Sequence, residues 1–76
     1  MIKQYVGQLY VETPWGGYWE DCGGGYRSEE DSAFADVNNS LVINEEHHYK
    51  NITRTRVMSR TISDWELVAE GVVVDE

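Results

Sequence analysis

Four of the six cations in this 76-residue chain share one stretch and one parity: Lys50, Arg54, Arg56 and Arg60. The stretch has no Gly or Pro and is rich in Thr, Ile and Val, which favours an extended strand. Because alternate residues of a strand lie on the same face, the four side chains would form one basic stripe. A basic sheet face beside an aromatic ring such as Tyr10 is typical of modules that bind single-stranded nucleic acid.

Two features argue against nucleic acid as the partner. The chain carries 14 Asp and Glu against six Lys and Arg, so its formal net charge is −8, and the field of such a protein repels polyanions. Glu12, Glu20 and Glu66 lie on or beside the expected neighbouring strands, where they would neutralise the stripe across the sheet. Nucleic-acid binding therefore remains the alternative to an interpretation based on the acids.

The acidic residues give the stronger indication of function. Six of them fall on the second expected strand and the first half of the expected helix: Glu20, Asp21, Glu29, Glu30, Asp31 and Asp36. There they would merge into one negative surface, complementary to a basic groove that otherwise holds DNA or RNA. Complementary charge increases association rate and specificity. The competing interpretation is a solvated helix face that only aids solubility.

Residue types that bind metals or act in catalysis also occur, but without a productive pattern. His47 and His48 follow Glu45 and Glu46, and adjacent histidines point in different directions on a regular backbone. Cys22 has no base placed beside it by a recognisable motif, and no G-x-S-x-G sequence occurs. We therefore expect no metal site, no cofactor and no enzymatic activity.

Gly23–Gly25 precede the expected helix, as the glycines of a phosphate-binding loop do. No Lys-Ser or Lys-Thr follows them, and three consecutive acids at 29–31 occupy the place that a phosphate would approach. The glycines therefore predict a flexible turn that ends the preceding strand.

Length and composition predict a small cytoplasmic protein. Residues 1–76 fit a single domain with a small core. The single cysteine excludes an internal disulfide and is typical of a reducing compartment. No apolar run approaches the length of a membrane span, and the first residues lack the apolar core of a signal peptide. We expect no membrane association.

The elements that must position these residues follow from periodicity. Residues 2–12 alternate as a strand, residues 13–17 form a turn around Pro14, and residues 18–22 return as a second strand. The core face of the first strand would comprise Tyr5, Gly7, Leu9 and Val11. Gly7 on this face would leave room for a helix to approach closely.

A helix is expected to begin at a Ser28 cap, with the acids at 29–31 in its first turn. Its sheet-facing side would comprise Ala33, Phe34, Val37 and Leu41. The end of the helix stays open between Val37 and Asn44, because residues 38–40 are poor helix formers. Residues 44–49 would form a polar connection.

The simplest assembly is an α+β fold of ββαβ type. A small antiparallel sheet of three to four strands, ordered 2-1-3, would carry one helix on one face and the basic stripe on the other. A bend at Ser63–Asp64 would separate the basic strand from an apolar segment at 65–69. Val72–Val74 would pair with a sheet edge within the chain.

The order of these parts resembles that of small phage-encoded accessory proteins. The resemblance rests on a short aromatic hairpin, a Ser-capped acidic helix at Ser28–Asp31 and a final Arg/Thr/Val strand at Arg54–Thr61. It covers most of the chain and is one of architecture and composition. Anti-CRISPR and other anti-defence inhibitors belong to this group. The resemblance implies a binding protein that blocks a host nucleoprotein complex.

We therefore predict a non-enzymatic acidic inhibitor, a DNA mimic that acts in the cytoplasm of an infected bacterial host. Its partner would be a host protein or nucleoprotein complex with a basic surface, and the inhibitor itself would be a monomer or weak homodimer. Two alternatives stand beside this prediction. One is a nucleic-acid module that uses the basic stripe, and the other is a structural phage protein that self-associates.

Overall fold

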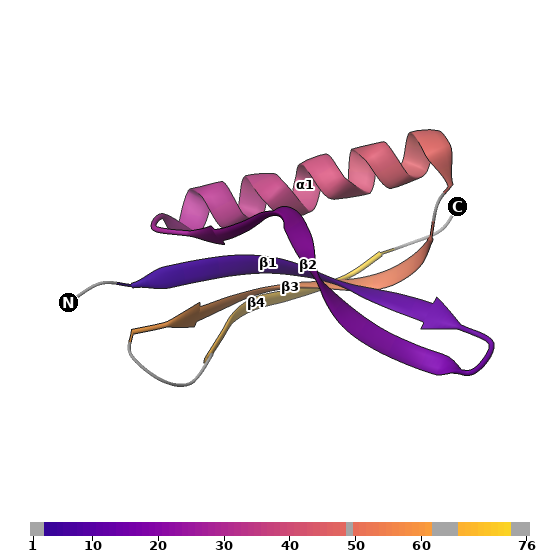
Figure 1. Ribbon diagram of the computed structural model, residues 1–76, viewed down its shortest axis with the longest axis horizontal. Helices are drawn as coiled ribbons and strands as arrows, with labels where there is room; N and C mark the ends of the chain where they lie inside the picture. The colour runs from indigo at the N-terminus through magenta and orange to yellow at the C-terminus, as the bar shows by residue number, and fades with distance from the viewer. Residues whose placement is uncertain (1–2, 49, 62–65, 74–76) are drawn as a thin grey trace.

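The structure, a computed structural model, describes residues 3–48, 50–61 and 66–73. Its elements are β1 (Gln4–Thr13), β2 (Gly16–Arg27), α1 (Glu30–His47), β3 (Asn51–Arg60) and β4 (Glu66–Val72). The four strands form one antiparallel sheet in the order β2-β1-β3-β4, and α1 packs on one face of it, over β2, β1 and β3 (Figure 1). The predicted α+β fold is confirmed, and β4 extends the predicted order at one edge.

The predicted core face of β1 is confirmed. Leu9 and Val11 are each 4% exposed, and Tyr5 packs against the core cluster. Gly7 lies directly under the helix, because a Cβ atom at this position would come within 2.7 Å of Val37 Cγ2 and 2.8 Å of the Ala33 carbonyl oxygen. The helix therefore rests on the backbone of β1, and glycine permits that distance.

The buried side of α1 is narrower than predicted. Ala33 and Val37 are buried, and Leu41 packs partly against the core cluster. Phe34 is instead 38% exposed. It lines a groove of about 240 Å³ between α1 and β4, which the helix does not cover. The core thus lies mainly between α1 and the three other strands.

The N-terminal end of α1 differs from the prediction. Its N-cap residue is Glu29, whose side chain makes no capping hydrogen bond, so the predicted Ser28 cap is wrong. Glu30 and Asp31 do occupy the first turn, where negative charge interacts favourably with the helix dipole. α1 contacts β1, β2 and β3, and packing of this kind stabilises a helix that has no side-chain cap.

The C-terminal end of α1 lies beyond the range predicted for it, which was between Val37 and Asn44. The helix continues through residues 38–46 to His47, so the polar connection predicted at 44–49 is wrong for most of its length. His48 ends the helix in the left-handed conformation (φ 52°), and its N–H donates to the Asn44 carbonyl oxygen at 2.6 Å. Packing of Leu41 against the sheet outweighs the low helix propensity of the residues before it.

β2 passes through the glycines that were predicted to end it. Its pairing with β1 runs to Gln8–Asp21 and resumes at Val6–Tyr26, so residues 22–25 bulge opposite Gly7 alone. Gly25 takes a positive φ of 68° within this bulge. The predicted end of β2 at the glycines is wrong. β1 continues alongside β2, so the pairing of the two strands resumes after the bulge.

The predicted pairing of the tail within the chain is confirmed for its first two residues. Val72 lies opposite Arg54 in β4, and the Val73 N–H donates to the Thr53 carbonyl oxygen at 2.9 Å. Val74 and the bend predicted at Ser63–Asp64 lie outside the described residues.

Candidate functional site

β3 places three arginines on the face of the sheet opposite α1. Arg54, Arg56 and Arg60 pair with even-numbered residues of β1, whereas the core residues Leu9 and Val11 are odd-numbered. Successive side chains of a strand point to opposite faces, so the arginines lie together and away from the helix. This part of the predicted basic stripe is confirmed.

Lys50 does not belong to that stripe, and its assignment to the stripe is wrong. The register of β1 against β3 shifts between the pairs Tyr10–Arg54 and Val11–Ile52, so β3 holds one extra residue there. One extra residue reverses the alternation of side chains along the strand. Lys50 precedes the shift and therefore lies on the helix side of the sheet.

The guanidinium groups reach across β1 to the aromatic rings of β2. Arg56 Cζ lies 3.9 Å from the centroid of the Trp19 ring, and Arg54 Cζ lies 5.1 Å from the centroid of the same ring. Arg60 Cζ lies 5.3 Å from the centroid of the Tyr26 ring. Since β1 separates β3 from β2, each of these contacts spans three strands. Cation–π contacts of this kind hold the long side chains against the sheet.

The side chains on this face are packed rather than loosely spread. Tyr10 and Trp19 make an edge-to-face contact, with ring centroids 5.2 Å apart and an interplanar angle of 64°. Val6, on the same face of β1, is only 1% exposed although no helix covers it. We call this set the arginine–aromatic face: Tyr10, Trp19, Tyr26, Arg54, Arg56 and Arg60.

Hydrogen bonds to neutral side-chain amides orient two of the arginines. Arg56 Nε donates to Gln8 Oε1 at 2.7 Å, and Gln8 Nε2 in turn donates to Asp21 Oδ1 at 2.7 Å. Arg60 Nε donates to Gln4 Oε1 at 2.9 Å. The amide of Gln8 is thereby held with its oxygen towards Arg56. The guanidinium group of Arg56 is fixed without being neutralised.

The third arginine, Arg54, forms an ion pair with Glu70 of β4. Of the acids predicted to neutralise the stripe, Glu20 pairs with Lys50, whereas Glu12 and Glu66 make no ion pair with the arginines within the described residues. Neutralisation of Arg54 by the edge strand could not be foreseen because the register of β4 depends on its own bulge, between Val57 and Met58 of β3.

No described element covers the arginine–aromatic face, since α1 lies on the other side of the sheet (Figure 1). Exposed apolar side chains surround the arginines: Tyr26 is 54% exposed, Leu67 53% and Val72 77%. The register places Leu67 opposite Met58 and Val72 opposite Arg54, on this same face. Trp, Tyr and Arg are the residues that most often dominate protein–protein binding energy.

The six acids predicted to form one partner surface lie in different places. Glu20 and Asp21 are adjacent in β2 and point to opposite faces of the sheet, since they pair with Leu9 and Gln8. Asp36 is held by Arg27. Only the group at the start of the helix is both contiguous and outside the ion pairs of the described residues: Glu29, Glu30 and Asp31.

The Asp36–Arg27 pair predicts an acid-sensitive contribution to stability. Arg27 Nε and Nη2 donate to the two carboxylate oxygens of Asp36 at 2.9 and 3.0 Å, which holds the pKa of Asp36 below its usual value. A lowered carboxyl pKa stabilises the folded state above the ordinary Asp pKa, and the effect is lost as pH falls through the folded-state pKa. We expect Asp36→Asn to lower the melting temperature by a few degrees at neutral pH.

Thermal unfolding at neutral pH and below the folded-state pKa of Asp36 tests this expectation. The difference between Asp36→Asn and the unsubstituted protein should disappear in acid, where the Asp36 carboxyl is protonated. Asp31→Asn, at an exposed position on the same helix, should differ less at either pH. Equal melting of Asp36→Asn and Asp31→Asn at neutral pH would contradict a stabilising pair.

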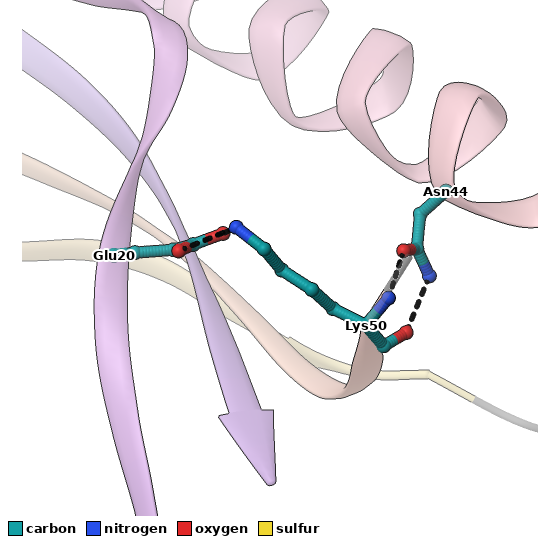
Figure 2. Close-up of polar contacts among 3 residues, drawn as sticks. All are labelled: Glu20, Asn44 and Lys50. Carbon is teal, nitrogen blue, oxygen red and sulfur yellow. Dashed lines mark hydrogen bonds and ion pairs between the residues drawn. The ribbon is translucent and has the colours of Figure 1, made fainter. Parts of the chain in front are cut away.

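Lys50 and Glu20 belong to a second polar cluster, on the helix side of the sheet. Figure 2 shows Lys50 Nζ donating to both carboxylate oxygens of Glu20, at 2.7 and 2.8 Å, and the Asn44 side chain bridging the backbone N–H and C=O of Lys50. The hydrogen bond to Glu20 raises the pKa of Lys50 above its usual value. The cluster ties the end of α1 to the start of β3 and to β2.

A cavity of about 310 Å³ lies beside this cluster. Leu9, Cys22, Ile43 and Ile52 form its apolar lining. Burial raises the pKa of the Cys22 thiol, so the thiol is protonated and weakly nucleophilic at neutral pH. The ammonium group of Lys50 at its rim is already held by Glu20, so we assign the cluster to the stability of the fold.

The described residues offer no metal site and no membrane-spanning helix. No three His, Cys, Asp or Glu side chains in the described ranges gather as the ligands of a metal ion would. The helix in the described part of the chain is not both long and apolar enough to cross a membrane.

Sequence reasoning identified Tyr10 beside the arginines but missed the two aromatic residues that β2 supplies. Trp19 and Tyr26 stand on β2 at positions of different parity, and only the bulge between them brings both to the face of Arg56 and Arg60. The even-numbered Gln residues of β1 were a usable signal, since they share the face that the arginines were expected to occupy.

No family model, curated protein or solved structure matches this chain.

Proposed function

We propose that this protein is a non-enzymatic binding protein that engages a protein partner through its arginine–aromatic face. The observation that carries the proposal is a packed layer of arginines and aromatic rings on a sheet face that no described element covers. Such a layer is pre-organised, so little side-chain freedom would be lost on binding.

A protein fits this face better than a nucleic acid does. The net charge of −8 repels a polyanion, and the same face carries the carboxylates of Asp21 and Glu70. Leu67 and Val72 add exposed apolar area at the margins of the face. A mixed patch of this kind is typical of the core of a protein–protein interface.

The resemblance to small phage accessory proteins supports a narrower version of the proposal. In that version the partner belongs to a bacterial defence nucleoprotein complex, and binding inhibits the complex. The acids at 29–31 would then contact a basic part of the same partner. This narrower version rests on composition and element order, and the net negative charge agrees with it.

An affinity capture from cells of the native host tests the proposal. The bait is the full chain, and the matched variants are Arg56→Ala with Tyr26→Ala on the arginine–aromatic face, and Glu30→Lys with Asp31→Lys on the helix. A partner that binds through the face should be lost with the first pair and kept with the second. Truncating a hot-spot residue costs about 2 kcal/mol or more, which weakens binding by roughly 30-fold.

Circular dichroism establishes that each variant folds, and nuclease treatment establishes whether the captured species is protein. Loss of the partner with the helix variants alone would transfer binding to the acids at 29–31 and overturn the proposal. Capture that requires intact DNA or RNA would establish the nucleic-acid alternative in its place.

A further inference from the structure

Two guanidinium groups share one indole ring on the arginine–aromatic face, but among the described residues a single carboxylate forms an ion pair with them. Arg54 and Arg56 both lie over Trp19, at 5.1 and 3.9 Å from the centroid of its ring. Glu70 forms its ion pair with Arg54. Within the described residues no acid pairs with Arg56. The pair of arginines therefore carries one uncompensated positive charge.

Contacts with neighbouring side chains orient the guanidinium group of Arg56 before any ligand binds. One side of its guanidinium group is stacked on Trp19, and its Nε is bonded to Gln8, whose own amide is anchored by Asp21. No described residue accepts a hydrogen bond from its two terminal nitrogens. These nitrogens form the fork that binds an oxyanion through two parallel hydrogen bonds.

The surroundings of Arg56 favour the binding of an anion to its guanidinium group, and no acid among the described residues fills that place. Desolvation by the neighbouring side chains, together with the charge of Arg54, lowers the pKa of Arg56. A guanidinium group nevertheless stays protonated at neutral pH. A charged group that is partly removed from water and lies beside a like charge gains from an anionic partner.

We propose that the terminal nitrogens of Arg56, above Trp19 and beside Arg54, bind a single carboxylate of a protein partner, from an Asp or Glu side chain. This inference rests on the proposed function and names the chemistry that the face recognises. A carboxylate is favoured over a nucleic-acid phosphate because only one charge is uncompensated, and Asp21 and Glu70 repel a run of phosphates. Exposed Leu67 and Val72 favour apolar residues beside that carboxylate.

A pair of synthetic peptides that differ only in the charge tests the assignment. The probes are acetyl-Ala-Leu-Glu-Leu-Ala-amide and the same peptide with Gln in place of Glu, added to the full-length protein at up to about 10 mM, where millimolar affinity is measurable. The readouts are the NMR signals of the Trp19 indole N–H and the Arg56 Nε–H. The Glu peptide should shift both signals and bind at least about tenfold more tightly than the Gln peptide.

Three substitutions distinguish recognition by the two terminal nitrogens of Arg56 from attraction to positive charge in general. Arg56→Gln should remove the preference for the Glu peptide, and Arg56→Lys should remove most of it, since an ammonium group keeps the charge but not the fork. Lys3→Gln, which removes one exposed positive charge outside the arginine–aromatic face, should bind the Glu peptide as the unsubstituted protein does. These comparisons are made only between variants whose remaining spectrum matches that of the folded protein.

The inference is overturned if the unsubstituted protein does not prefer the Glu peptide over the Gln peptide, including if neither binds. It is also overturned if a folded Arg56→Gln variant keeps the preference. Tighter, salt-sensitive binding of octathymidylate than of the Glu peptide would replace it with nucleic-acid recognition. Failure of the peptide test leaves the affinity capture standing, because a face can bind a protein without recognising a carboxylate.

Discussion

Gly7→Ala is expected to destabilise the protein by about 1–3 kcal/mol, the usual cost of overfilling a packed core. The new methyl carbon would lie 2.7 Å from Val37 Cγ2 and 2.8 Å from the Ala33 carbonyl oxygen. The second neighbour is helix backbone, so relief requires α1 to shift away from the sheet. A domain of this size has a total stability of roughly 3–5 kcal/mol, so the loss is a large share of it.

Gly23→Ala is the matched control for Gly7→Ala. Both substitutions add one methyl group to a glycine of the same sheet, but a Cβ atom at Gly23 has no neighbour within 4 Å. Urea unfolding of the two variants should show a clear loss for Gly7→Ala and little change for Gly23→Ala. If the two variants unfold at the same urea concentration, α1 does not rest on β1 as closely as the structure places it.

Leu9→Ala is expected to lower the free energy of unfolding by about 2–5 kcal/mol. This loss is comparable to the whole stability of a domain of this size, so a large fraction of the molecules would be unfolded at room temperature. Leu9 is 4% exposed and lies in the core cluster with Cys22, Ala33 and Val37. Truncating it removes buried apolar contacts and leaves a cavity that a helix and a sheet in fixed contact cannot close. Far-UV circular dichroism and urea unfolding measure the loss.

Leu67→Ala supplies the comparison for Leu9→Ala at a surface position of the same sheet. Leu67 is 53% exposed, so the same chemical change should alter stability by about 0.5 kcal/mol or less. A similar loss for both variants would mean that something covers Leu67 in solution, and that the margin of the arginine–aromatic face is not free.

The arrangement of the arginines explains how one surface serves both stability and binding. Arg54, Arg56 and Arg60 lie across β1 and pack against the rings of Trp19 and Tyr26 on β2. The same contacts hold the guanidinium groups in one geometry before any partner arrives. An arginine that packs against an aromatic ring can still offer its terminal nitrogens to a ligand.

Local periodicity determined a large part of this structure. The alternation in residues 2–12 identified the core face of β1, and Gly7 on that face indicated where the helix would approach. The even spacing of Arg54, Arg56 and Arg60 placed them together on the open face. These features were predictable because they depend on residues within one strand, where side chains alternate with a fixed period of two.

Tertiary contacts decided what the alternation alone could not. The extra residue in β3 moved Lys50 to the helix side, and the bulge opposite Gly7 carried β2 past its glycines to Tyr26. Packing of Leu41 extended the helix to His47. Each outcome depends on pairing between segments far apart in sequence, so no window of residues contains the information.

The candidate site was likewise predictable from the sequence only in part. Residue spacing was enough to predict that three arginines share a face, and composition shows that the chain as a whole is acidic. Strand pairing, by contrast, places Trp19 under two of those arginines, brings Glu70 to one of them and divides the predicted acidic surface between two faces of the sheet. Register accounts for this difference, because a shift of one residue between neighbouring strands exchanges the two faces for every side chain beyond it.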